Sequence, residues 1–343
     1  MESQMDQVDE RDTVQQTMPA IVQDRYGLPS RVLTLREVPL PRVGRGEVLV
    51  QVHSSSVNAM EWHLVNGKPY LLRVAFGLRP RRSTLGADVA GTVVAVGEDV
   101  TRLAPGDHVF GEIGAGAYAG YAIAQERHLV VKPETVGFEE AAAVGVAGLT
   151  ALQGLRDVLA CKRGQKVLII GASGGVGTYA VQIAKWLGAE VTAVCSTRNV
   201  AQAEELGADV VINYEREDVT RSSGRFDAIF DLVGNHPLRS CKRLTAPGGT
   251  YLMVGGPKGD WAGPLPRLLA GAVVFAFGDA RVRTFVAASN ADDLTQLAEL
   301  MASGRLRSVI EDRIPLTDVP AALERQGRFH ARAKTVVNVE GVL

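Results

Sequence analysis

Four glycines, Gly171, Gly174, Gly175 and Gly177, crowd into one short stretch of the chain. Glycine allows a tight turn with positive φ, and without a Cβ it lets backbone N–H groups approach a diphosphate closely. A helix that begins at such a turn adds unpaired donors and roughly half a positive charge. The spacing GxxGxxG is one residue longer than the usual GxGxxG fingerprint, so the flanking sequence decides its interpretation.

The flanking sequence predicts a strand before the glycines and a helix after them. Residues 167–170 form an apolar run that suits a buried parallel strand. Beyond the turn, apolar residues recur at i, i+3, i+4 and i+7, and Gly188 ends this helical stripe. A second β run follows at residues 190–194, as a βαβ unit requires. We predict a dinucleotide-binding turn; the alternative is a turn that only tightens strand–helix packing.

The residues after the second strand bear on the choice between NAD(H) and NADP(H). An acidic residue there would bind the ribose hydroxyls and repel a 2′-phosphate. The chain instead has Cys195, Ser196, Thr197 and Arg198, with hydroxyls, a guanidinium and no carboxylate. These groups suit a phosphate, so the sequence favours NADP(H). The alternative is a solvated turn that caps a helix starting near Asn199.

The surrounding pattern predicts two units of different class. Residues 18 to 132 contain short β runs separated by Gly and Pro turns, typical of a barrel-like antiparallel sheet. An alanine-rich helix is expected at 138–159, followed by alternating strands and helices, as in a doubly wound α/β sheet. The six predicted strands are residues 167–170, 191–195, 210–212, 228–233, 250–254 and 273–277. Because that sheet is then complete, the closing strand at 335–339 is expected to pack on the first unit.

Composition limits the classes of protein. A chain of 343 residues should form two domains, and its net charge of −1 gives no general attraction to nucleic acid or membranes. Three scattered cysteines indicate free thiols in a reducing compartment. Residues 1–17 are polar, without an apolar signal core, and are expected to be disordered. We therefore expect a cytoplasmic protein without a membrane span.

Several separated motifs resemble one family. They are GADVAGTVVAVG, PGDHVFG, AGLTALQGL and GASGGVGTYAVQIAKWLGAEV, in this order. Over residues 18–339 the chain resembles the zinc-independent, quinone oxidoreductase-like branch of the medium-chain dehydrogenase/reductase superfamily. The resemblance implies a GroES-like catalytic domain at 18–137 and 281–343, a Rossmann domain at 138–280, and a cleft between them.

Zinc-dependent members of that superfamily have a cysteine where this chain has Asn58, and a His-Glu pair where it has Ala87-Asp88. The group of four structural cysteines is also missing, and the six histidines lack ligand spacing. Because zinc needs three or four converging N, S or O ligands, we expect no metal. Without zinc, reduction of an activated acceptor is favoured over alcohol oxidation.

The resemblance implies an NADPH-dependent reductase of quinones or α,β-unsaturated carbonyls, with a small electrophilic acceptor. An enoyl-thioester reductase on the same scaffold is one alternative. A non-catalytic NADPH-binding sensor or structural protein is another, since a fingerprint predicts binding and not turnover. A zinc-dependent alcohol dehydrogenase is the least favoured.

Site residues follow from the same resemblance. The implied contacts to the cofactor are Thr150, Gly171, Ala172, Ser173, Gly174, Gly175, Val176, Gly177, Ser196, Arg198, Tyr214, Val233, Gly234, Val254 and Gly255. Asn58 is expected near the nicotinamide ring and Trp62 in the acceptor pocket. For Tyr214 the alternative is covering the sheet edge, for Asn58 bonding a turn, and for Trp62 core packing. Glu61 stands where the branch usually has Asp, and Ala333 where glycine is common.

Two further expectations concern partners. The apolar run 273–277, taken as the last strand at a sheet edge, calls for a partner, so a homodimer is expected. The basic stretch Arg79-Pro80-Arg81-Arg82 is interpreted as a solvated loop, or as a rim that attracts anionic acceptors. It lacks interleaved aromatic residues, so no nucleic-acid partner is expected.

Overall fold

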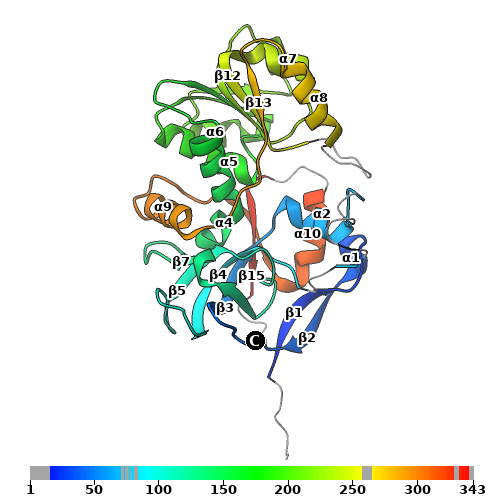
Figure 1. Cartoon of the computed structure of the whole chain (residues 1–343), viewed down its shortest axis with the longest axis vertical. Helices are drawn as coiled ribbons and strands as arrows, with labels where there is room; N and C mark the ends of the chain where they lie inside the picture. The colour runs from blue at the N-terminus through cyan, green and yellow to red at the C-terminus, as the bar shows by residue number, and fades with distance from the viewer. Residues whose placement is uncertain are drawn as a thin grey trace, which may run out of the picture.

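The computed structural model of the chain describes residues 16–70, 73, 77, 79–80, 84–256, 265–327 and 332–339. Figure 1 shows a lower unit rich in β-strands and an upper unit with helices beside a sheet. Helix α4 (Phe138–Gln153) contacts α5 of the upper unit and strands β3, β4 and β5 of the lower one. The α/β fold predicted from the sequence, GroES-like plus Rossmann, is confirmed.

The upper unit is a six-stranded parallel sheet in the order β10-β9-β8-β11-β12-β13. Its strands are β8 (Lys166–Ile170), β9 (Glu190–Cys195), β10 (Val210–Asn213), β11 (Phe226–Asp231), β12 (Thr245–Met253) and β13 (Arg281–Arg283). Its helices are α5 (Gly175–Trp186), α6 (Val200–Glu205), α7 (Leu238–Leu244) and α8 (Leu265–Phe275). The chain runs outward from β8 to β10 and then returns to β11, on the other side of β8. Ligands of open α/β sheets bind at such a reversal, beyond the carboxyl ends of the strands.

The lower unit is a seven-stranded sheet in the order β14-β15-β3-β4-β5-β7, with β6 paired to β3. Its strands are β3 (Glu47–Ser56), β4 (Asp88–Val96), β5 (His108–Glu112), β6 (Tyr121–Gln125), β7 (Leu129–Val131), β14 (Ile310–Pro315) and β15 (Lys334–Asn338), and β1 (Thr17–Gln23) pairs with β2 (Leu33–Pro39). The other helical elements are α1 (Pro29–Val32), α2 (Ala59–Asn66), η1 (Glu126–His128), η2 (Gly154–Val158), η3 (Thr197–Asn199), η4 (Val219–Arg221), α9 (Ala291–Ala302), η5 (Leu316–Asp318) and α10 (Val319–Gly327). As predicted, the C-terminal strand β15 joins the lower unit, antiparallel to β3.

The predicted limits of the units need two adjustments. The domain boundary placed at residue 280 falls just before β13, which pairs with β12 in the parallel sheet. Of the N-terminal extension expected to be disordered, residues 1–15 lie outside the described residues, while Thr17 already begins β1.

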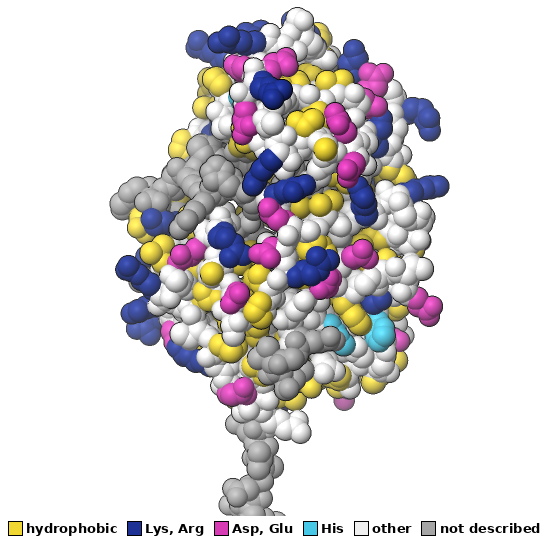
Figure 2. Space-filling view, turned by 180° about the vertical axis from the view of Figure 1, so that it is seen from behind, with side chains coloured by type: hydrophobic (Ala, Val, Ile, Leu, Met, Phe, Trp, Pro, Cys, Tyr) yellow, Lys and Arg dark blue, Asp and Glu magenta, His cyan; other side chains and the backbone are white. Residues whose placement is uncertain are grey.

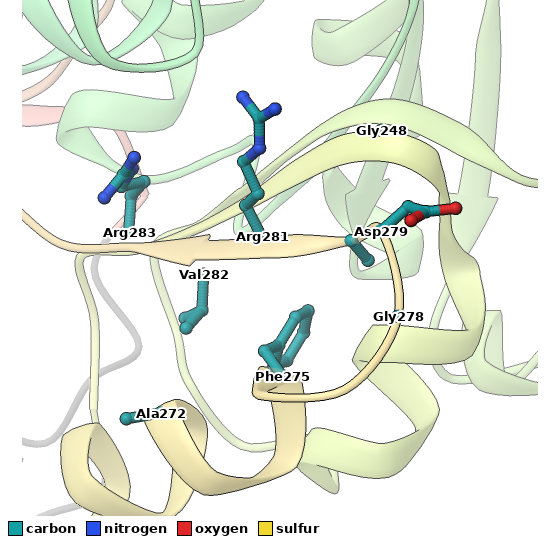
Figure 3. A pocket seen from close by; sticks show the side chains of 9 residues that line it. Gly248, Ala272, Phe275, Gly278, Asp279, Arg281, Val282 and Arg283 are labelled. Carbon is teal, nitrogen blue, oxygen red and sulfur yellow. The ribbon is translucent and has the colours of Figure 1, made fainter.

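The strand predicted at 273–277 is wrong, because these residues continue and follow helix α8. The sixth strand is β13, which begins only at Arg281. Figure 3 shows Phe275 and Ala272 of α8 on the same side of β13 as Val282, lining a cavity of about 510 Å³. Because both ends of β13 carry arginines and the strand is short, its open edge is poorly suited to pairing.

The end of helix α8 predicts that substitution of two nearby phenylalanines changes the free energy of unfolding by very different amounts. Phe275 is buried and stacks on Tyr251, with ring centroids 5.6 Å apart, whereas Phe277 is 80% exposed. We expect Phe275→Ala to lower the free energy of unfolding by about 3–5 kcal/mol. Phe277→Ala should change it by less than about 0.5 kcal/mol. Denaturant titration at low protein concentration measures both, and equal losses, as for one face of a strand, would contradict the helix.

Candidate functional site

The glycine turn between β8 and α5 has the form that a diphosphate requires. A Cβ added to Gly177 would lie 2.1 Å from the Gly171 carbonyl oxygen, so only glycine allows the helix to start this close to the turn. Among the described residues, no side chain caps α5 at Gly174. Its first N–H groups and the positive end of the helix dipole therefore suit an anionic ligand.

The turns after β11 and β12 lie at the same carboxyl edge of the sheet. The buried Asp231 shapes the first turn, because its Oδ1 accepts the N–H groups of Val233 (2.9 Å) and Gly234 (2.8 Å). A Cβ added to Gly255 would lie 2.2 Å from the Leu232 carbonyl oxygen, so the turn containing Val254 and Gly255 packs directly on the first. The sequence-predicted residues Val233, Gly234, Val254 and Gly255 are thus brought together beside the glycine turn.

The loop after β9 carries Ser196 and Arg198, as predicted, but it is not free of carboxylates. Glu215, which follows β10, accepts from the Thr197 hydroxyl at 2.5 Å. Hydrogen bonds from Thr197, with help from the nearby Arg198 charge, lower the pKa of Glu215, so it is anionic. The sequence interpretation missed this acid because it comes from the neighbouring strand, where parallel pairing sets Asn213 beside Cys195. Tyr214 is 55% exposed at the same edge.

Asn58 is the N-cap residue of helix α2, and both polar atoms of its side chain form hydrogen bonds with neighbouring residues. Its amide nitrogen donates to Asp88 Oδ2 (2.9 Å) and to the Ser56 carbonyl (3.3 Å). Its Oδ1 accepts from Lys334 Nζ at 2.7 Å. Asn58 therefore has no amide hydrogen left for an acceptor molecule, and only a lone pair of Oδ1 remains.

Asp88 and Lys334 form a buried ion pair beside Asn58. Lys334 Nζ lies 3.3 Å from Asp88 Oδ2, and their side chains are 2% and 0% exposed. Asp88 Oδ1 accepts the Val146 N–H at 2.7 Å, which ties the pair to α4. The Lys334 stem also contacts the glycine turn, since a Cβ added to Gly175 would meet Lys334 Cδ at 3.2 Å.

Glu61 completes this group, which we call the buried polar cluster: Ser56, Asn58, Glu61, Asp88, Tyr118 and Lys334. The carboxylate of Glu61 accepts the N–H groups of Asn58 and Ala87, each at 2.9 Å, and the Tyr118 hydroxyl at 2.5 Å. Burial nevertheless raises the pKa of Glu61 to about 7, against the opposing effect of these hydrogen bonds.

Thr150 and Trp62 lie on elements that border the buried polar cluster. Thr150 donates to the Val146 carbonyl at 2.7 Å, one helical turn beyond the N–H that binds Asp88. The indole of Trp62 occupies the space beside Gly327, where an added Cβ would meet Nε1 at 2.1 Å, a contact that favours packing against α10.

Sequence reasoning missed Lys334 and Tyr118 as members of this cluster. Lys334 stands at the start of a strand, where a lysine is usually exposed, and nothing in the sequence signals its burial. Of the basic stretch considered from the sequence, Arg81 and Arg82 lie outside the described residues.

The pKa of Glu61 predicts how stability changes with pH. Since it is about 7 in the folded chain against an ordinary 4.5, the folded state binds this proton more tightly than the unfolded state does. The resulting stabilisation is complete below about pH 4.5 and is lost as pH rises through 7. We expect wild type to lose roughly 2–3 kcal/mol more than Glu61→Gln over this range. Denaturant titrations across pH measure this, with the exposed Glu190→Gln as control; equal slopes for wild type and Glu61→Gln would refute it.

The described residues hold no group of three or more His, Cys, Asp or Glu side chains that could bind a metal ion. None of the helices in the described part of the chain is long and apolar enough to cross a bilayer. On the face seen in Figure 2, basic and acidic side chains are interspersed.

Comparison with known proteins gives consistent matches along the chain. Residues 44–134 match the model of the alcohol dehydrogenase GroES-like domain, and residues 206–337 match that of a zinc-binding dehydrogenase. The chain is 34% identical to the chloroplastic quinone-oxidoreductase QR1 of Triphysaria versicolor, over 93% of this chain and 98% of that protein. It is 32% identical to the trans-enoyl reductase pgmF of Aspergillus terreus, over 88% and 90%.

A solved structure agrees with these sequence matches. The quinone oxidoreductase from Coxiella burnetii superposes with a TM-score of 0.83 at 31% identity, over 95% of this chain and all of that one. The family inferred from the sequence motifs is confirmed. The chain belongs to the quinone oxidoreductase-like branch of the medium-chain dehydrogenase/reductase superfamily, a family of oxidoreductases that use a nicotinamide cofactor.

Proposed function

We propose that this protein is an NADPH-dependent reductase that transfers a hydride to quinones or α,β-unsaturated carbonyl compounds without a metal ion. One observation carries the proposal: the Lys334 ammonium lies between Asn58 and Asp88, directly beside the dinucleotide turn. Although Lys334 is paired with Asp88, a positive charge fixed at this place would favour the negative charge that develops on the acceptor during hydride transfer.

The same ammonium supports a reaction without metal, although one matching family model is named for zinc binding. Asn58 and Asp88 stand at two positions where zinc-dependent members have metal-site residues, and both are already bonded to Lys334. A divalent cation beside Lys334 would meet like charge. The amide of Asn58 is also a weaker zinc ligand than a thiolate.

When bound, the nicotinamide cofactor supplies the hydride, which the protein has no side chain to provide. The glycine turn and the N-terminus of α5 would hold the diphosphate, and Ser196 and Arg198 would hold the 2′-phosphate. Asn58 Oδ1 could accept a hydrogen bond from the bound cofactor or acceptor, and Thr150 would lie near the nicotinamide ring. Trp62 packs against α10 and would at most form the wall of the acceptor pocket. These residues position the reactants, which accounts for much of the rate in a hydride transfer.

Preference for NADPH depends on a balance of charges at the loop after β9. Arg198 and the Ser196 hydroxyl favour the 2′-phosphate, whereas Glu215 repels it. We assign NADPH because Glu215 is bound to the Thr197 hydroxyl and faces the Arg198 charge, so its own charge is partly compensated.

A second candidate is an enoyl-thioester reductase on the same site. The relative pgmF, called a trans-enoyl reductase and 32% identical over 335 residues, favours it. The homodimer and the cytoplasmic location stay predictions. The dimer no longer rests on an edge strand at 273–277, but on the exposed apolar side chains of α8, such as Leu269 and Val273, and the adjacent Phe277.

An acceptor panel tests the proposal. Oxidation of NADPH and NADH at 340 nm is followed with 1,4-benzoquinone, 9,10-phenanthrenequinone, a simple enone and crotonyl-CoA. We expect turnover with NADPH and a quinone or the enone. Arg198→Ala should weaken NADPH binding about tenfold or more and leave NADH unchanged. The control is Arg225→Ala, an exposed residue directly before β11, at the amino ends of the parallel strands.

Other outcomes of the panel separate the alternatives. Best turnover with crotonyl-CoA would select the enoyl-thioester reductase. NADPH binding without turnover of any acceptor would favour the sensor, and a preference for NADH would refute the cofactor assignment.

Replacing Lys334 separates its charge from its structural role. Lys334→Met leaves Asp88 buried without a counter-ion and should lower stability by about 3–5 kcal/mol. The double variant Lys334→Met/Asp88→Asn removes both charges and should recover part of that loss, yet its kcat should stay at least about tenfold below wild type. The exposed Lys162→Met is the matched control. Wild-type kcat in the folded double variant would show that the charge does not assist the reaction.

A further inference from the structure

Arg332 is fixed beside the dinucleotide turn by the backbone that follows it. The Ala333 N–H donates to the Ser173 carbonyl at 2.8 Å, and Ala333 forms a parallel bridge with Gly174. The chain then enters β15 of the lower unit. Arg332 therefore belongs to the C-terminal segment but lies against the Rossmann unit.

The guanidinium of Arg332 reaches the first turn of α6, where Nε donates to Gln202 Oε1 at 2.7 Å. A guanidinium has only donors, so Gln202 must turn its oxygen toward Arg332 and its NH₂ group away. That Nε2 is buried and has no hydrogen-bond partner among the described residues, and Gln202 as a whole is 6% exposed. A buried donor without an acceptor is costly, which indicates that an acceptor binds here.

Asn199, a second buried residue at this place, is bonded to Ser196 and keeps its own Oδ1 without a partner among the described residues. Asn199, 3% exposed, donates from Nδ2 to Ser196 Oγ at 3.0 Å. Because Ser196 Oγ accepts this bond, its own hydrogen is left to donate, and no acceptor for it is found within the described residues. Ser196, Gln202 and Arg332 thus present hydrogen-bond donors around the start of α6.

The positive charge of Arg332 indicates that the missing acceptor is an anion. Within the described part of the chain the Arg332 guanidinium forms no ion pair. The neighbouring Glu311 instead accepts the backbone N–H of Arg332 at 2.8 Å. Glu205, on the same helix as Gln202, pairs with Arg307 at 3.5 Å.

We propose that Arg332 and Gln202, together with Ser196, bind the 2′-phosphate of NADPH. This inference rests on the proposed function, which assigned that phosphate to Ser196 and Arg198 alone. The start of α6 follows β9, where a Rossmann unit contacts the adenosine ribose, so the 2′-phosphate suits this position better than the diphosphate does. The C-terminal segment then contributes to cofactor choice, and cofactor binding links β15 to the Rossmann unit.

Binding measurements with two nucleotide pairs test the assignment. Dissociation constants are measured by titration for NADPH and NADH, and for adenosine 2′,5′-bisphosphate and 5′-AMP, which carry no diphosphate bridge. Arg332→Gln should raise the constant for NADPH and for the bisphosphate about 10- to 100-fold and leave NADH and 5′-AMP within about twofold. Gln202→Leu should act in the same direction with a smaller effect, and it provides the test if Arg332→Gln does not fold. The exposed Arg305→Gln is the control.

Two results overturn the inference. Equal weakening of NADPH and NADH would assign Arg332 to the diphosphate, and unchanged NADPH binding in both folded variants would remove it from the site. The proposed function fails separately, if wild type prefers NADH or if no acceptor is reduced. If Arg198→Ala loses its selectivity for NADPH while Arg332→Gln keeps it, only the present inference is refuted.

Discussion

The arrangement of the buried polar cluster depends on one carboxylate, Asp88. Burying a charge is strongly unfavourable unless it is paired and its remaining lone pairs are satisfied. Asp88 meets that condition with four donors: Ser56 Oγ, Asn58 Nδ2, Lys334 Nζ and the Val146 N–H. These come from β3, the start of α2, β15 and α4, so a single side chain fixes four segments around the place where the two units meet.

This constraint explains why the C-terminal strand returns to the lower unit at its particular place. Lys334 must reach Asp88 from β15, and β15 pairs with β3 at residues 54–56, directly before Asn58. The same strand begins one residue after Ala333, which is bonded to the glycine turn. The backbone that is bonded to the glycine turn therefore belongs to the same segment that supplies Lys334 to the buried polar cluster, so the turn and the cluster share one structural element.

Most of this architecture could be predicted because its strands and helices leave local signals in the sequence. Strands bounded by turn residues and a glycine turn between strand and helix are local signals, and they located five of the six parallel strands. The strand predicted at residues 273–277 was wrong because a short apolar run has no periodicity that distinguishes a strand from a helix. Glu215 and Lys334 were missed for another reason: their roles come from side chains that the sheet register brings beside them, and register is not local.

In the segment Arg332-Ala333-Lys334, two cations separated by a single residue bond to different units of the protein. In a regular strand, residues i and i+2 point to the same face. Ala333 has φ = 52°, in the left-handed region that residues with a Cβ rarely adopt, and this breaks the alternation. Lys334 can then enter the buried polar cluster while Arg332 turns to Gln202. A glycine at this position would hold the same φ without strain. The strain of alanine, about 1–3 kcal/mol, is smaller than the roughly 3–5 kcal/mol lost when a buried ion pair such as Lys334–Asp88 is broken. The backbone strain at Ala333 is therefore maintained by the hydrogen bonds of its two neighbours, from Arg332 to Gln202 and from Lys334 to Asn58.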